Sequence, residues 1–160
     1  MAITLQAYLV PEALIFGMDA ETSEEVIRNL AGKLMYAGYV RGSFAEGVLT
    51  RERAQPTGLP LDGKYNAAIP HTDVDHVIKP GIAMATLARP VMFRNMVNPE
   101  EQVPVQLVFL LALDQPKSQI EMLQQVSHVL QNPELVEHLM NARNLFQVRE
   151  ALRKANAVSP

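Results

Sequence analysis

Gln106–Leu113 (Gln-Leu-Val-Phe-Leu-Leu-Ala-Leu) is the stretch that decides the fold class. Its last seven residues, Leu107 to Leu113, form the longest unbroken apolar run of the chain. A strand with one face in water carries polar side chains at alternate positions, so this continuous run predicts a strand that is covered on both faces. A membrane-spanning helix would need roughly 18 or more such residues. We therefore expect the middle of a sheet here and no transmembrane segment.

The segments around this strand predict the rest of the fold. Short apolar runs favour strands at residues 14–18, 66–69, 81–87 and, more briefly, 91–94. Capping boxes predict helix starts at Thr22, Ser43 and Ser118, and the Asn132-Pro133 pair predicts another. The first two helices are expected to end near Gly38 and Arg53, a loop covers 54–65, and a last helix covers 145–154.

The order of these elements predicts an α/β fold. The middle strands follow one another without intervening helices, whereas helices gather toward both ends. We therefore expect a single layered domain over residues 1–160, with a mixed central β-sheet flanked by helices.

Composition narrows the possible partners and the compartment. The chain has 160 residues, of which 48% are hydrophobic and 19% charged, as in a folded domain. The net charge of −3 gives no basic surface for a nucleic acid. Cysteine is absent, which excludes thiolate chemistry and disulfides, and the first residues do not resemble a secretory signal. A cytoplasmic protein that does not bind nucleic acid is expected.

His71 is the histidine whose position suggests chemistry. It follows a short apolar run in Ala68-Ile69-Pro70-His71, so its side chain is delivered to the edge of the sheet, where α/β folds place their sites. The other candidate histidines, His128 and His138, lie inside predicted amphipathic helices and are expected to be surface or half-buried residues without a role.

A segment upstream of this strand has the residues of an anion site. Arg51 lies at a predicted helix end, and Pro56-Thr57-Gly58 forms a turn after it. Arginine offers a planar fork of donors, threonine a hydroxyl, and glycine lets backbone N–H groups approach an anion. The alternative is that the arginines only neutralise the helix dipole and that the turn has no function.

The segment after His71 also contains the ligand types of a metal site. His71, Asp73, Asp75 and His76 could hold zinc, iron or manganese. In an extended segment, however, His76 would point away from the other three. A polar loop that leaves the sheet explains the same residues, and the main expectation is that there is no metal.

The motifs together resemble a known family. Arg51-Glu52 at a helix end, then Pro56-Thr57-Gly58, then Ile69-Pro70-His71, in this order, are similar to the enzyme IIA domain of the sugar phosphotransferase system, in its fructose–mannitol superfamily. The resemblance extends from about Leu14 to Leu152 and implies a phosphotransferase component with a phosphohistidine intermediate.

The resemblance implies specific partners and roles. Such domains accept a phosphoryl group from the phosphocarrier protein HPr and pass it to enzyme IIB, and they need no cofactor. They bind no sugar directly and meet the membrane component IIC only indirectly. His71 matches the phosphorylated histidine, and Arg51 with Thr57 or backbone donors would stabilise the phosphoryl group.

One position departs from the mannitol and fructose members. Many of these carry a second histidine at the start of the helix after the long buried strand, where this chain has Gln119. Its amide can donate a hydrogen bond to a phosphoryl oxygen but supplies no charge, and the alternative is a surface residue without a role. This difference, the longer stretch before Ile-Pro-His and the free-standing chain resemble the galactitol-type IIA proteins.

Two other functions are compatible with the sequence. A regulatory protein similar to the nitrogen-type IIA proteins would keep the fold and the phosphorylated histidine but act by binding other proteins. A metal-dependent hydrolase would use the residues 71–76 named above. A neighbouring gene for IIB or IIC would favour transport, and stoichiometric metal in the purified protein would favour the hydrolase.

Overall fold

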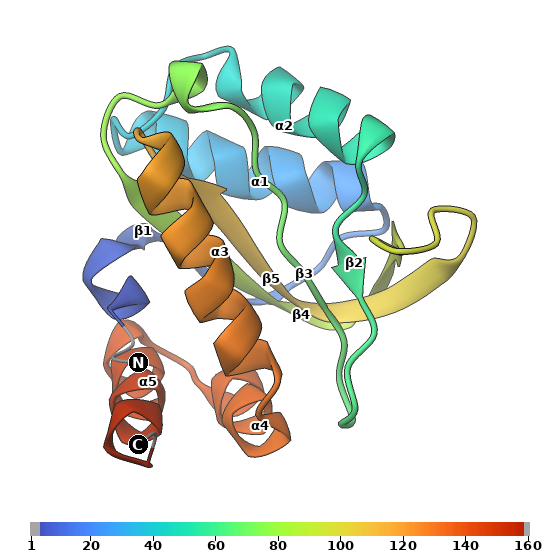
Figure 1. The fold of residues 1–160 in the computed structure, drawn as a ribbon, viewed down its shortest axis with the longest axis vertical. Coiled ribbons are helices and arrows are strands. Elements are labelled where there is room, and N and C mark those ends of the chain that lie inside the picture. The colour runs from blue at the N-terminus through green and yellow to red at the C-terminus, as the bar shows by residue number, and fades with distance from the viewer. Residues whose placement is uncertain (1–3, 159–160) are drawn as a thin grey trace.

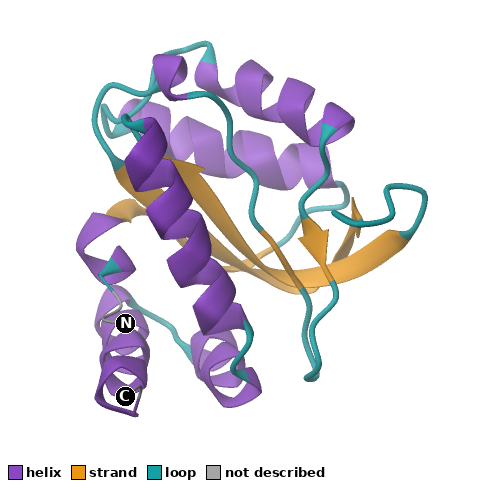
Figure 2. Cartoon of the chain, viewed as in Figure 1, coloured by secondary structure: helices purple, strands orange, loops and turns teal. Residues whose placement is uncertain are grey.

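The computed structural model describes residues 4–158, with side chains from Thr4 to Lys154. A five-stranded sheet lies between two groups of helices (Figures 1 and 2). Its strand order is β1 (Leu9–Met18), β4 (Gly81–Arg94), β5 (Gln102–Ala112), β3 (Ala67–Ala68) and β2 (Gly58–Leu59). The β1–β4 and β3–β5 pairs are parallel, whereas the β4–β5 and β2–β3 pairs are antiparallel. The prediction of a mixed sheet flanked by helices is confirmed.

The central strand is β5 (Gln102–Ala112), which contains most of the apolar run that predicted it. Leu107, Phe109 and Leu111 belong to the core on one side of the sheet. Val108 and Leu110 belong to the core on the other side. The strand is therefore covered on both faces, as its sequence predicts, and it begins four residues earlier than the predicted residue 106.

The remaining strands differ from the predictions in length. β1 (Leu9–Met18) begins before residue 14, since Leu9 already pairs with Ile82, and its register with β4 shifts between Leu9 and Leu14. The predicted strands 81–87 and 91–94 are one strand, β4 (Gly81–Arg94), whose register with β5 shifts between Thr86 and Val91. β3 is only Ala67–Ala68, and β2 (Gly58–Leu59) lies within the predicted loop.

Two groups of helices bury the two faces of the sheet. α1 (Ser23–Tyr36) and α2 (Phe44–Ala54) share one hydrophobic core with the sheet. α3 (Pro116–Leu130), α4 (Pro133–Asn141) and α5 (Leu145–Val158) cover the other face. A short 3-10 helix, η1 (Leu5–Tyr8), packs against the second group. The described chain contains no helix of the length and hydropathy needed to cross a membrane.

Two of the predicted helix starts are confirmed by cap hydrogen bonds. The side chain of Thr22 accepts from the amide of Glu25 at 3.2 Å, and the side chain of Asn132 accepts from the amide of Leu135 at 3.2 Å. Gly38, two residues after α1, has a φ of 87°, the left-handed conformation that favours glycine.

The helix start at Ser43 is also confirmed, but without the predicted cap bond, and the start at Ser118 is wrong. α2 begins directly after Ser43, but the hydroxyl of Ser43 forms its hydrogen bond with Nδ1 of His76 at 2.8 Å and makes no cap bond. α3 begins at Pro116, so Ser118 lies inside the helix. Proline has the helical φ already and lacks an N–H that would need a partner, which explains why the helix starts there.

The parallel pairing of β3 and β5 determines where the site lies. Ala68 pairs with Val108, and the amide of Leu111 donates to the carbonyl of Pro70 at 3.1 Å. The carboxyl ends of both strands therefore meet at one edge of the sheet. His71 follows β3 at this edge, and α3 begins four residues after the end of β5.

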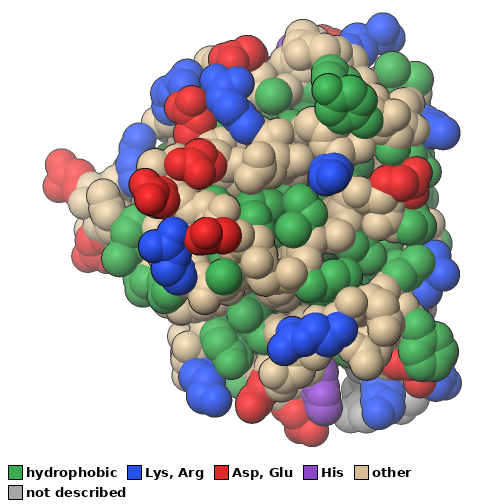
Figure 3. All heavy atoms as spheres, turned by 180° about the vertical axis from the view of Figure 1, so that it is seen from behind, with side chains coloured by type: hydrophobic (Ala, Val, Ile, Leu, Met, Phe, Trp, Pro, Cys, Tyr) green, Lys and Arg blue, Asp and Glu red, His purple; other side chains and the backbone are tan. Residues whose placement is uncertain are grey.

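Charged side chains of both signs are mixed on the face turned away from Figure 1. Figure 3 shows acidic and basic groups interspersed with apolar ones on that face. This face carries no continuous basic surface of the kind that tracks a phosphate backbone.

Candidate functional site

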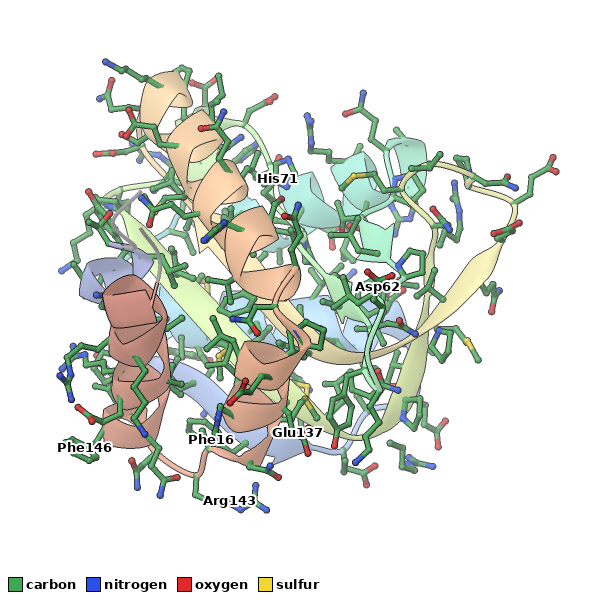
Figure 4. The ribbon with its side chains drawn as sticks, turned by 60° about the horizontal axis from the view of Figure 1, so that its bottom comes forward. Phe16, Asp62, His71, Glu137, Arg143 and Phe146 are labelled. Carbon is green, nitrogen blue, oxygen red and sulfur yellow. The ribbon has the colours of Figure 1, made fainter. Side chains whose placement is uncertain are left out.

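His71 is buried at the edge of the sheet. The segment that carries it passes between α3 and α2, as Figures 1 and 4 both show. The side chain is buried, with 7% of its surface exposed, and Nδ1 lies 2.9 Å from the carbonyl oxygen of Ile69. A carbonyl oxygen only accepts hydrogen bonds, so Nδ1 carries the proton. The lone pair of the neutral imidazole therefore lies on Nε2.

The surroundings of His71 favour its neutral form. Burial is the main cause and lowers the pKa of His71 below its usual value, and the positive charge of Arg51 lowers it further. The hydrogen bond to Ile69 and the charge of Asp73 act in the opposite direction but do not outweigh burial. At neutral pH the side chain is thus an uncharged nucleophile with a defined tautomer.

Arg51 lies close enough to His71 to affect its charge, and it has a hydrogen-bond donor without an acceptor among the described residues. Its Nη1 is 4.0 Å from Oδ1 of Asp73, a long ion pair between a half-buried arginine and an exposed aspartate. Its Nε is buried and has no hydrogen-bond partner among the described residues. A buried guanidinium N–H without an acceptor is unfavourable, so an anion bound beside His71 would gain both a charge and a donor.

An open hollow adjoins these residues on the α2 side. Its volume is about 530 Å³, and its lining includes Arg51, Thr72, Asp73 and His76. Solvent and a partner's side chains can therefore reach the neighbourhood of His71 from α2.

Both hydrogen-bond donors of Thr57 are already bonded to Glu52. Its hydroxyl donates to Oε1 of Glu52 at 2.8 Å, and its amide donates to Oε2 of the same carboxylate at 2.9 Å. Thr57 could donate to a phosphoryl group only by leaving Glu52. Glu52 is not among the residues that the sequence predicts for the site, although the Glu52–Thr57 spacing across a helix end was the available signal.

Gly58 has a packing role that the anion interpretation did not foresee. A Cβ atom at Gly58 would lie 2.6 Å from the carbonyl oxygen of Arg94, and Gly58 forms a bridge with Asn95. The glycine thus permits the close approach of β2 to the end of β4. This contact explains the glycine of Pro56-Thr57-Gly58 without an anion.

Gln119 is the fourth residue of α3, the helix that begins four residues after the end of β5. Its Oε1 is buried and accepts no hydrogen bond from the described residues. This unsatisfied atom is an acceptor, as a phosphoryl oxygen is, so Gln119 could contact a phosphoryl group only through its NH₂ group.

The four residues of the alternative metal site do not converge. In the described part of the chain, no group of three His, Asp or Glu side chains could hold a metal ion. His71 bonds to Ile69, whereas His76 lies in a 3-10 turn, η2 (Val74–His76), and bonds to Ser43. The two imidazoles are held by different parts of the fold.

His76 has a structural role that the sequence did not reveal. A Cβ atom at Gly47 would lie 2.9 Å from its Nε2, so the glycine of α2 leaves room for the loop that carries His76. The remaining histidines face the surface as expected: His128 is exposed, and His138 forms a 3.8 Å contact with Glu134.

Known proteins are similar to this chain in sequence and in fold. The galactitol-specific EIIA component of Escherichia coli K12 is 27% identical over 124 residues, which cover 78% of this chain and 81% of that protein. The crystal structure of IIA mannitol from E. coli has a TM-score of 0.75 at 28% identity and covers 90% of this chain and 98% of that one. The structure of E. coli enzyme IIA mannitol in complex with phosphorylated enzyme IIB has a TM-score of 0.73 at 25% identity, with coverage of 91% and 97%.

The family match covers nearly the whole chain. Residues 8–155 match the family described as phosphoenolpyruvate-dependent sugar phosphotransferase system, EIIA 2. This range contains the helix that carries Arg51, the segment that carries His71 and the start of α3. The chain therefore belongs to the EIIA 2 family of the phosphoenolpyruvate-dependent sugar phosphotransferase system and is a phosphotransferase component of that system.

Proposed function

We propose that this phosphoryl carrier takes its phosphoryl group from phospho-HPr onto Nε2 of His71 and transfers it to enzyme IIB. The observation that carries the proposal is the hydrogen bond from Nδ1 of His71 to the carbonyl of Ile69, which leaves the lone pair on Nε2. The low pKa of His71 keeps that nitrogen unprotonated at neutral pH.

The transfer needs no group beyond the side chains present. Nε2 attacks the phosphorus, a new N–P bond forms, and the bond between phosphorus and HPr breaks with its electron pair returning to HPr. Transfer to IIB repeats this exchange with His71 as the leaving group. The guanidinium of Arg51 and the amide of Gln119 stabilise the charge that spreads over the phosphoryl oxygens. We expect no cofactor and no metal.

The proposed sugar is galactitol, and the proposed compartment is the cytoplasm. The galactitol-specific relative supports this assignment through its similarity along most of both chains. By the family resemblance, Gln119 stands where the mannitol type carries a second histidine. The sugar is recognised elsewhere in the system, so no residue of the His71 site carries that specificity.

Intact mass after incubation with enzyme I, HPr and phosphoenolpyruvate tests the proposal. We expect one added phosphoryl group on the wild type and none on His71→Ala. His128→Ala, which changes an exposed histidine of α3, is the matched control and should be labelled normally. Labelling of a folded His71→Ala protein would refute the assignment.

A second experiment tests the acceptor. Purified galactitol-type and mannitol-type IIB from E. coli are offered to the phosphorylated protein, and loss of label is followed. Faster transfer to the galactitol-type IIB is expected. Transfer to neither would contradict the transport role and favour the regulatory alternative.

A further inference from the structure

We propose that Glu52 is a positioning residue of the phosphoryl site, which ties the helix that carries Arg51 to the strands that carry His71. This inference rests on the proposed function at His71. Glu52 touches neither the phosphoryl group nor His71, and it acts through Thr57.

The first part of the connection is the contact between Glu52 and Thr57. Both carboxylate oxygens of Glu52 accept hydrogen bonds from Thr57, one from the amide at 2.9 Å and one from the hydroxyl at 2.8 Å. Thr57 is 3% exposed. Without Glu52, a buried amide and a buried hydroxyl would lose their acceptor, and the turn would have to move to reach water.

The second part leads from Thr57 to the imidazole. Gly58 pairs with Ala68 and Leu59 with Ala67 in the antiparallel β2–β3 ladder. The ladder ends at this Gly58–Ala68 pair, and Thr57 and Ile69 are the residues that directly adjoin the pair on the two strands. The carbonyl of Ile69 is the group that holds Nδ1 of His71. A displaced turn would therefore disturb the acceptor that selects the tautomer of His71.

The third part concerns Arg51, which directly precedes Glu52 on α2. The carbonyl of Arg51 accepts from the amide of Gln55 within the same helix end. On the far side of the turn, Nη1 of Arg94 donates to the carbonyl of Arg53 at 3.0 Å. The Glu52–Thr57 hydrogen bonds thus hold the end of α2 against the start of β2.

The position of Glu52 disfavours the charged form of its carboxylate. Burial raises the pKa of Glu52, while the two hydrogen bonds from Thr57 and the charge of Arg94 lower it and only partly compensate. A half-buried carboxylate that is disfavoured in its charged form but makes two directed bonds is more consistent with a geometric role than with a gain in stability.

Four variants test the proposal. Glu52→Ala and Thr57→Val each remove part of the connection. Glu52→Gln should rescue it, because the amide oxygen can accept from the amide of Thr57 while the NH₂ group donates to its hydroxyl. Asn66→Ala is the matched control, since Asn66 accepts from the amide of Leu61 at 2.9 Å and so holds the β2–β3 hairpin at its other end.

Two measurements are made on each variant: the rate of phosphoryl transfer from phospho-HPr, and the ¹⁵N shifts of the His71 imidazole, which report the tautomer. For Glu52→Ala we expect about 10–100-fold slower transfer and ¹⁵N shifts that move toward a mixture of tautomers. Glu52→Gln and Asn66→Ala should remain close to wild type in both measurements.

Three results would overturn the proposal. The first is a folded Glu52→Ala protein whose imidazole ¹⁵N shifts and transfer rate equal those of the wild type. The second is a loss of transfer rate in Asn66→Ala as large as that in Glu52→Ala. If Glu52→Ala does not fold, Thr57→Val decides by the same criteria, and wild-type behaviour there is the third. Absence of phosphorylation on wild-type His71 would refute the proposed function instead, and the ¹⁵N comparison would still test the link between Glu52 and the imidazole.

Discussion

Arg51→Ala separates a role in transfer from a role in folding. In the structure without phosphate, the guanidinium makes one 4.0 Å ion pair, with Asp73, whose side chain is 79% exposed. Pairs of this kind contribute at most about 1 kcal/mol to stability. The free energy of unfolding should therefore change little when Arg51 is truncated.

The expected effect on transfer is much larger. A phosphoryl group at Nε2 would give the unpartnered Nε of Arg51 its acceptor and its charge a counter-ion. Loss of one such donor from a charged transition state costs about 1.4–4 kcal/mol, which corresponds to about 10–1000-fold in rate. Because the charge of Arg51 also lowers the pKa of His71, the variant should lose activity at a higher pH than the wild type on acidification.

The assay is single-turnover transfer from phospho-HPr, followed by intact mass across a pH series, with unfolding in urea measured in parallel. Arg53→Ala is the control, since it removes the same charge two residues away on α2, where Arg53 pairs with Glu24 at 3.7 Å. Transfer by Arg51→Ala within about twofold of wild type would refute the reasoning, as would an equal loss in Arg53→Ala.

Two further predictions concern Gln119 and the titration of His71. Gln119→Ala should shorten the lifetime of the phosphohistidine or slow transfer, whereas Gln119→His should be tolerated because an imidazole can donate from nearly the same place; rates of phosphate loss and of transfer to IIB measure both, and wild-type values for Gln119→Ala would remove it from the site. For His71, the lowered pKa predicts that the transfer rate falls on acidification only at a lower pH than an ordinary histidine would give. Below about pH 6.5 His71 binds a proton more readily in the unfolded chain than in the folded one. The free energy of unfolding of the wild type, measured in urea, should therefore fall more steeply on acidification than that of His71→Gln. Parallel curves for the two proteins would contradict the burial argument.

The sequence by itself determined the fold class and indicated the family. The apolar run in β5 required a strand with cores on both sides, and no polar position allowed one face to lie in water. The order of Arg51, Pro56-Thr57-Gly58 and Ile69-Pro70-His71 was enough to indicate the family, which the match over residues 8–155 confirmed. Their roles in transfer remain predictions.

Only the tertiary structure decided which atoms these residues have free. Local patterns predicted a cap for Ser43, yet a loop thirty-three positions away supplies His76 as its partner. Thr57 reads as a free donor in the sequence, but Glu52 takes both of its hydrogens. The nucleophilic nitrogen of His71 depends on the carbonyl of Ile69. In each case several groups could serve as hydrogen-bond partner, and the packed fold decides which of them lies within reach. Composition and spacing along the sequence do not specify that choice.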